Sequence, residues 1–328
     1  NALYDAGRKS SLAYFETIYQ RLGTKFDYYF FESETGALGK KLVEENMGKV
    51  FEKSDGAVIF RGEKYGLHTR VFLNSEGLLT YEAKELGLAK LKFGKYPYDE
   101  SVVITGNEVA GYFAVLKKVL ELVAPDLARR TRHLPHGMLR LPGGKMSSRT
   151  GAVITAESLL TEVKTTVAQK IAERNFNTEE SEKVTEAVAV AAVKYPILKQ
   201  APGRDVIFNL AKALSLEGDS GPYLQYTYVR ARAVLEKAKT ENISPSVKQP
   251  TAEISELERR LTHYPEIVAR AATLTAPNLL VTYLTELASV FNTYYATQKI
   301  VDLDDPFSAY RLALTATFAQ IMKSGLTL

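Results

Sequence analysis

The chain contains no cysteine, which excludes disulfide bonds and thiolate zinc sites. A reducing compartment suits such a chain, so we expect it in the cytoplasm. No apolar run approaches the roughly 20 residues of a membrane-spanning helix, and we expect no membrane partner. Histidine is scarce, with four in 328 residues. His133 and His136 are three apart, but Pro135 between them disfavours a helical metal pair, and we expect no bound metal.

A large charge excess is also missing. The formal net charge is +4, and 45% hydrophobic with 24% charged residues is ordinary for a globular protein. Basic residues exceed acidic ones in residues 1–155, nearly balance them in residues 156–328, and exceed them locally in residues 194–239. Composition therefore permits a nucleic-acid partner without requiring one. The length predicts two domains.

Residues 1–155 alternate helix-like and strand-like segments. Helical spacing of apolar residues marks residues 10–22, 35–47, 82–93 and 107–123. Aromatic or β-branched runs predict strands at residues 26–31, 57–60, 70–73 and 102–105. The two middle strands flank a turn and are expected to pair or form a hairpin. This order predicts an α/β layer with a largely parallel sheet.

After residue 155 the strand signals stop. Helices are expected from Thr178, from Pro222 through Lys239, and from Pro277. The last helix should run from Asp305-Pro306 to a stop at Lys323-Ser324-Gly325. Residues 156–328 are therefore predicted to form an all-helical bundle.

The most informative segment is residues 143–151, Gly-Gly-Lys-Met-Ser-Ser-Arg-Thr-Gly. A lysine on a glycine-hinged loop, followed by hydroxyls and an arginine, can close over a polyphosphate and neutralise charge in a transition state. It is not a Walker A loop, because Leu139 and Met146 stand where that pattern needs Gly and Ser or Thr. The stretch resembles the KMSKS signature of class I aminoacyl-tRNA synthetases. With its flanks it is most similar to the arginyl-tRNA synthetase version.

This resemblance implies that ATP, accompanied by Mg²⁺, is a substrate. The residues implied in catalysis are Lys145, Ser147, Ser148 and Arg149. The residues implied in ATP binding are Met138, Leu139, Lys145 and Met146. Lys145 would counter the charge on the leaving pyrophosphate, and the hydroxyls and Arg149 would hold the closed loop against the phosphates.

Residues 77–87 resemble the family segment that binds arginine, where a Tyr is followed four residues later by an acid. Tyr81 and Glu85 would share one face of a helix. A carboxylate can accept two parallel hydrogen bonds from a guanidinium, and an aromatic ring can stack on it. The alternative is a helix start with an exposed acid and a core tyrosine.

Residues 101–109 resemble the next strand and loop of the family. The family usually has Gln where this chain has Val109, and Asp where it has Glu85. The implied arginine-binding residues are therefore Tyr81, Glu85 and Val109, with two departures from the family pattern in one pocket.

Residues 217–226, Glu-Gly-Asp-Ser-Gly-Pro-Tyr-Leu-Gln-Tyr, resemble the family run that opens a long helix of the anticodon-binding domain. Tyr226 and Arg230 would lie on one face of that helix, and an aromatic ring with a cation suits an RNA base and its phosphate. The alternative is that Tyr226 is a half-buried packing residue.

A second class I signature, His-x-Gly-His, is absent, since none of the histidines at 68, 133, 136 and 263 forms it. The chain therefore resembles the C-terminal part of an arginyl-tRNA synthetase, with the missing motif expected upstream. The implied fold is a partial Rossmann-like catalytic domain in residues 1–155, followed by an all-helical anticodon-binding domain in residues 156–328. The implied partners are L-arginine, ATP and tRNA-Arg, and we expect a monomer.

Two alternatives remain open at this point. The chain could be a non-catalytic tRNA-binding fragment or paralogue, which Val109 and the absent histidine motif favour. It could also be a class I synthetase of another specificity or a related nucleotidyl transferase, which the run at residues 217–226 disfavours.

Overall fold

The computed structural model describes residues 2–140, 155–171 and 178–328. Their contacts divide them into two compact units. The first unit holds the described residues up to Met138 together with residues 202–204, and the second holds the rest. The domain boundary near residue 155 stays a prediction.

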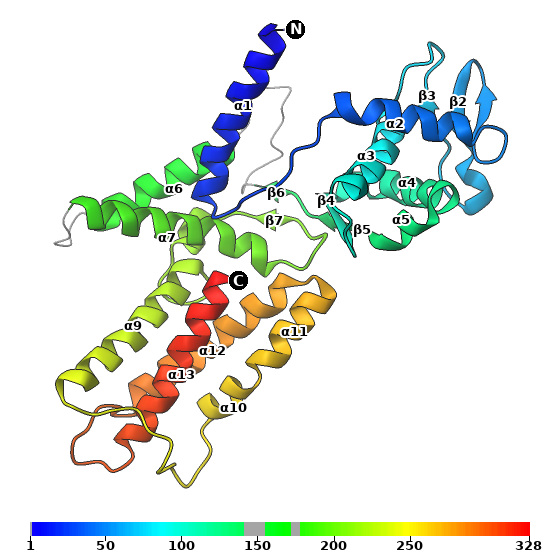
Figure 1. Cartoon of the computed structure of the whole chain (residues 1–328). Helices are drawn as coiled ribbons and strands as arrows, with labels where there is room; N and C mark the ends of the chain where they lie inside the picture. The colour runs from blue at the N-terminus through cyan, green and yellow to red at the C-terminus, as the bar shows by residue number, and fades with distance from the viewer. Residues whose placement is uncertain (1, 141–154, 172–177) are drawn as a thin grey trace. The chain divides into compact units, whose positions relative to one another are not determined.

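The first unit combines helices with short strands (Figure 1). Its helices and 3₁₀ turns are α1 (Ala2–Arg21), α2 (Glu32–Glu45), η1 (Gly62–Tyr65), α3 (Tyr81–Lys95), η2 (Asn107–Val109), α4 (Ala110–Val123) and α5 (Pro125–Arg130). Its strands are β1 (Glu52–Ser54), β2 (Ala57–Phe60), β3 (Arg70–Leu73), β4 (Ser101–Gly106) and β5 (Thr131–His136).

Strands β1, β2 and β3 form an antiparallel sheet in that order. The predicted pairing of residues 57–60 with 70–73 is confirmed. The expectation of a largely parallel sheet is wrong in this region. Only Asp55 and Gly56 join β1 to β2, both with positive φ (51° and 79°), and a two-residue connection can join antiparallel strands only.

Strands β4 and β5 pair in parallel, from Ser101 opposite Thr131 to Gly106 opposite His136. The connection between them carries η2, α4 and α5, the crossover that a parallel pair requires. Because α4 follows β4 almost at once, the residues of its first turn lie at the carboxyl end of that strand.

The strand predicted at residues 26–31 is wrong. The segment lies between α1 and α2 without regular structure, and none of the described strands pairs with it. Its rings contact the preceding helix instead: the Phe26 centroid lies 4.7 Å from that of Tyr19, and the Tyr29 hydroxyl donates to Glu16. An aromatic run favours a strand only where a neighbouring strand completes the hydrogen-bond ladder.

Helix α3 packs closely against α2 because two glycines stand at the contact. A Cβ on Gly39 would lie 2.0 Å from the carbonyl oxygen of Ala83, and one on Gly87 would lie 2.1 Å from that of Thr35. Close backbone approach of this kind requires glycine. The close contact between α2 and α3 holds α3 against an apolar core that includes Val43, Phe72, Leu86 and Val119.

The second unit is mainly helical. Its helices are α6 (Ala156–Ile171), α7 (Thr178–Lys199), α8 (Leu210–Ala213), α9 (Gly221–Thr240), α10 (Glu256–Thr262), α11 (Tyr264–Leu274), α12 (Pro277–Thr297) and α13 (Ser308–Thr327). In Figure 1, α9, α12 and α13 run alongside one another. Their core includes the rings of Phe291 and Phe318, stacked with centroids 3.9 Å apart. The predicted helical bundle is confirmed for these elements.

Two details of this unit differ from the sequence prediction. A two-residue strand, β7 (Val206–Ile207), pairs in parallel with β6 (Leu139–Arg140), and a strand this short leaves no periodic signal. Helix α13 also runs through its predicted stop. Gly325 is buried inside the helix, where a Cβ would lie 2.7 Å from the Leu284 side chain, so it serves close packing rather than termination.

No helix among the described residues is long and apolar enough to cross a membrane.

Candidate functional site

The loop that carries the clearest sequence motif lies outside the described residues. This applies to Lys145, Met146, Ser147, Ser148 and Arg149. Their predicted roles therefore stay predictions.

Two further residues predicted to bind ATP are described. Met138 follows β5, and its sulfur would lie 3.6 Å from a Cβ placed on Gly106 at the end of β4. Leu139 begins β6 and pairs with Val206. Their roles in ATP binding also stay predictions.

The first described site lies at the start of α3. Thr80 fixes that start, because its hydroxyl donates to the carbonyl of Val71 (2.7 Å) and its amide to that of Phe72 (3.1 Å). Tyr81 follows and is 59% exposed. Glu85, one turn later, is half-buried. The structure therefore places both residues on α3, with the tyrosine on the surface and the carboxylate partly withdrawn from water, the reverse of the alternative reading.

Burial raises the pKa of Glu85, and the nearby positive charge of Lys92 partly offsets that rise. Lys92 is partly buried too; its Nζ donates to the hydroxyl of Ser101 at 2.9 Å, and burial lowers its pKa. Within the residues that the structure describes, no ion pair to Glu85 is formed. A positively charged ligand beside this carboxylate would lower the free-energy cost of its ionisation.

A small cavity of about 30 Å³ lies beside Glu85 and Lys92. Its wall includes Phe113 and His133, whose rings stack with centroids 4.2 Å apart. His133 also shares a hydrogen bond of 2.7 Å with the Thr105 hydroxyl, and burial lowers its pKa. A cavity of this volume holds about one water molecule, so it is too small to be a substrate pocket.

Val109 ends η2 and directly precedes α4. It is partly buried and packs against the apolar core of the first unit. The structure therefore does not give it a polar role. Tyr112, one turn further along α4, contacts Tyr81 edge-on with centroids 6.2 Å apart. Sequence reasoning missed Tyr112, because only the packing of α4 against α3 brings it to this place.

The second described site lies on α9. Ser220 caps this helix by accepting a hydrogen bond from the Tyr223 amide (3.0 Å), and Pro222 stands in the first turn. Gly221 allows close approach to α7, because a Cβ there would lie 2.3 Å from the carbonyl oxygen of Ala191. The motif at residues 217–226 therefore starts the helix and fixes its contact with the bundle.

Tyr226 and Arg230 lie on one face of α9, as predicted. The guanidinium carbon of Arg230 lies 4.8 Å from the Tyr226 ring centroid and 5.0 Å from that of Tyr295 on α12. Arg230 also donates to the Tyr226 hydroxyl (3.1 Å) and to the side-chain oxygen of Asn292. Asn292 in turn donates to the Tyr223 hydroxyl at 2.9 Å.

Tyr226 and Tyr295 are 41% and 42% exposed. The face therefore presents two rings with an oriented cation between them, a surface suited to a stacked base and a phosphate. Tyr295 and Asn292 were missed by sequence reasoning. Both lie more than sixty residues after Arg230 in the chain, and nothing in the local sequence pairs them with it.

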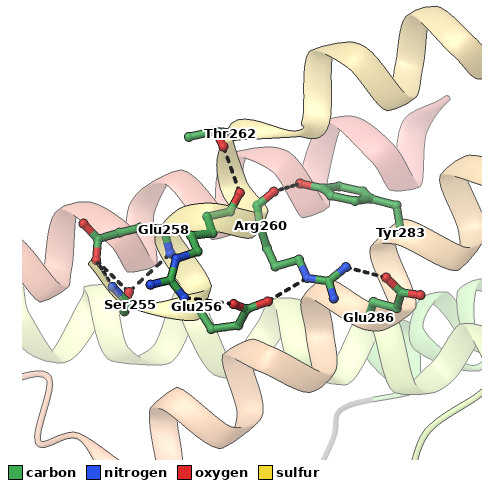
Figure 2. A network of polar contacts seen from close by, with 8 residues as sticks. Ser255, Glu256, Glu258, Arg260, Thr262, Tyr283 and Glu286 are labelled. Carbon is green, nitrogen blue, oxygen red and sulfur yellow. Dashed lines mark hydrogen bonds and ion pairs between the residues drawn. The ribbon is translucent and has the colours of Figure 1, made fainter. Parts of the chain in front are cut away.

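A third polar network, on α10 and α12, is shown in Figure 2. Arg260 bridges Glu256 (3.0 Å) and Glu286 (2.6 Å), and its backbone carbonyl accepts a hydrogen bond from the Tyr283 hydroxyl (2.8 Å). A groove of about 510 Å³ beside it is lined by residues of both charges. Because the acidic and basic side chains largely neutralise one another, this network stabilises the packing of α10 on α12.

Comparison with known proteins decides the family. Residues 15–210 match the family model described as tRNA synthetases class I (R), catalytic domain. Residues 224–328 match the DALR anticodon binding domain. The chain belongs to the arginyl-tRNA synthetase family. The predicted order of a class I catalytic domain followed by a helical anticodon-binding domain is confirmed.

Arginine–tRNA ligases from two bacteria illustrate the relationship. The chain is 33% identical over 339 residues to that of Parabacteroides distasonis, covering 100% of this chain and 57% of that protein. It is 34% identical over 324 residues to that of Flavobacterium psychrophilum, covering 96% of this chain and 54% of that protein. The chain thus spans somewhat more than half the length of these arginyl-tRNA synthetase relatives.

Solved structures agree in fold. The arginyl-tRNA synthetase of Thermus thermophilus matches with a TM-score of 0.78 and 25% identity, covering 94% of this chain and 60% of that one. The enzyme of Plasmodium falciparum matches with a TM-score of 0.81 and 17% identity, covering 99% and 56%. Tyr81 and Glu85 on α3 lie within the residues that match the catalytic domain. Tyr226 and Arg230 on α9 lie within the residues that match the anticodon binding domain.

Proposed function

We propose that the protein containing this chain is an arginyl-tRNA synthetase. It activates L-arginine with ATP, forming arginyl-adenylate and releasing pyrophosphate. It then transfers the arginyl group to the 3′ end of tRNA-Arg and releases AMP. The observation that carries this proposal is the succession, in one chain, of the catalytic match and the anticodon-domain match.

In the arginine site, Glu85 accepts hydrogen bonds from the guanidinium and Tyr81 covers it with its ring. The partly buried position of Glu85 supports this role, because an ion pair is stronger where water is partly excluded. Val109 adds an apolar wall. Glu85 is one methylene longer than the family's usual Asp, so its carboxylate can reach further from the axis of α3.

In the ATP site, backbone groups of Met138 and Leu139 meet the adenine. Lys145 neutralises the pyrophosphate as it leaves, while Ser147, Ser148 and Arg149 hold the loop closed over the phosphates. Met146 of the same loop contributes to ATP binding. Mg²⁺ enters with ATP as part of the substrate.

In the RNA site, Tyr226 stacks on a base of the tRNA-Arg anticodon loop and Arg230 contacts the adjacent phosphate. The fixed orientation of Arg230 supports this role, because its bond to Asn292 and its position between two rings leave little freedom to lose on binding. Tyr295 forms the second ring of the same surface. We further propose that the protein acts as a monomer in the cytoplasm.

The test is amino-acid-dependent ATP–pyrophosphate exchange across the twenty amino acids, with tRNA present, on the protein expressed from its complete reading frame. Arginine alone should support exchange. Exchange with a different amino acid would assign another class I specificity. No exchange with any amino acid, combined with retained tRNA binding, would assign a non-catalytic tRNA-binding paralogue.

A further inference from the structure

Tyr112 has a buried hydroxyl that the fold does not satisfy. Within the part of the chain that the structure describes, its oxygen is screened from solvent and has no hydrogen-bond partner. Buried polar groups are nearly always paired, and an unpaired one destabilises the folded state. An unpaired hydroxyl at this depth therefore suggests a group that is paired only when a ligand is present.

The surroundings of Tyr112 are those of the arginine site. Its ring meets Tyr81 edge-on at 6.2 Å and Phe113 edge-on at 5.1 Å. Arg70 lies over the ring, 5.7 Å from the centroid. Tyr81, which contacts Tyr112, shares one face of α3 with Glu85. Burial raises the pKa of Tyr112, and the negative charge of Glu85 raises it further. The phenol is therefore neutral at physiological pH.

The missing partner can be identified by its chemistry. Ionised Glu85 accepts hydrogen bonds only, and its negative charge attracts a cation to the face of α3 that it shares with Tyr81. A neutral phenol oxygen can accept a hydrogen bond as well. A positively charged group with several N–H donors in one plane can satisfy both acceptors at once. A guanidinium has five such donors and no acceptor.

The first turn of α4 offers no other side chain for this task. Val109 precedes Tyr112 by three residues, so the two lie on neighbouring positions of one helical face. Val109 has no hydrogen-bonding group and packs on the apolar core. On this face, Tyr112 supplies the polar atom.

We propose that Tyr112 is a specificity-determining residue of the arginine site, whose hydroxyl accepts a hydrogen bond from the substrate guanidinium that Glu85 binds. This inference rests on the proposed function. It assigns the arginine pocket two acceptors from two helices, Glu85 from α3 and Tyr112 from α4. A ligand with a primary ammonium group cannot reach both acceptors with a planar pair of donors, so the arrangement also selects arginine over lysine.

The test is Tyr112→Phe, which removes the hydroxyl and keeps the ring. In arginine-dependent ATP–pyrophosphate exchange by the full-length protein, the KM for arginine should rise about tenfold, as expected for one lost hydrogen bond. The kcat should change less than the KM, and the preference for arginine over lysine should narrow. Because the hydroxyl is unpaired without ligand, the Tm of the free variant should equal or exceed that of the wild type.

Tyr98→Phe is the matched control, since the Tyr98 hydroxyl lies in the same unit and donates to the Ala89 carbonyl at 3.4 Å. It should leave the KM for arginine unchanged. Calorimetric titration of each variant with arginine, without ATP, gives a second measure that does not depend on turnover. Unchanged arginine affinity in Tyr112→Phe, with an active wild type, would overturn this inference and leave the proposed function standing. A wild type that neither binds nor uses arginine would overturn both.

Discussion

Arg230 donates a hydrogen bond to the hydroxyl of Tyr226, one turn earlier on α9, and lies 4.8 Å from the centroid of the same ring. The cation and the ring are therefore held as one unit on an exposed helical face. We predict that Tyr226→Ala weakens tRNA binding by about 1–3 kcal/mol, the usual contribution of a base stacked on an aromatic ring. Filter binding of tRNA-Arg at moderate salt measures this loss.

The matched control for that variant is Val229→Ala. Val229 is on the same helix and 58% exposed, so its truncation should leave binding within about twofold of the wild type. Equal losses in the two variants would mean that the effect comes from general disturbance of α9 and not from stacking.

Arg230→Gln should reduce tRNA affinity and also reduce its dependence on salt. One lost phosphate contact lowers the slope of log K against log salt by about one unit. Arg232 offers a control on the same helix, because it is exposed and paired with Glu236 at 3.1 Å. If Arg232→Gln changes the salt slope as much as Arg230→Gln does, the assignment of Arg230 to a phosphate is wrong.

Glu85→Gln should weaken arginine binding without lowering the stability of the folded chain. Losing hydrogen bonds to a charged group should weaken arginine binding by about 1.5–3 kcal/mol. The pKa of Glu85 is raised by burial in the folded chain, so the folded state binds this proton more tightly than the unfolded state does. The associated stability is lost as pH rises from the unfolded pKa through the folded one.

Glutamine cannot ionise, so the variant does not lose stability in this way as the pH rises. The Tm of Glu85→Gln should therefore equal or exceed the wild-type Tm at pH 7.5, and the difference should vanish below about pH 4. Glu108→Gln, at an exposed position, serves as the control for both measurements. A Tm for Glu85→Gln well below the wild type at pH 7.5 would point to a structural carboxylate.

Phe291→Ala should destabilise the helical unit by about 3–5 kcal/mol, because it removes a fully buried ring stacked on Phe318. Val247→Ala, at a position 73% exposed, should cost less than about 0.5 kcal/mol. Urea unfolding followed by far-UV circular dichroism would compare the two. A small effect of Phe291→Ala would show that this core can repack.

Lys145→Ala should lower kcat for arginine activation about 100- to 1000-fold while changing ATP affinity much less, because the charge it neutralises develops in the transition state. Steady-state exchange kinetics on the full-length protein separate the two parameters. An unchanged kcat would remove Lys145 from the chemical step.

The sequence was sufficient for features that depend on local pattern. Residues 82–93 and 222–239 showed helical spacing and are helical. The four-residue spacing of Tyr81 with Glu85 and of Tyr226 with Arg230 placed each pair on one helical face. These predictions needed only the geometry of the α-helix.

Features that depend on distant neighbours could not be predicted in this way. Residues 26–31 have strand-like composition but no strand beside them among the described residues. Tyr112 lies beside Tyr81, and Tyr295 beside Arg230, only because their helices pack against α3 and α9. The Asp55-Gly56 turn between β1 and β2 is by contrast a local hairpin signal, because an Asp-Gly pair favours a tight two-residue turn.

The proposed function is tested most directly by charging total tRNA with labelled arginine, using the protein expressed from its complete reading frame, and sequencing the acylated tRNAs. Arginine isoacceptors should be charged, and Tyr226→Ala should reduce the charging rate at low tRNA concentration. Absence of arginyl-tRNA, or charging spread over unrelated isoacceptors, would contradict it.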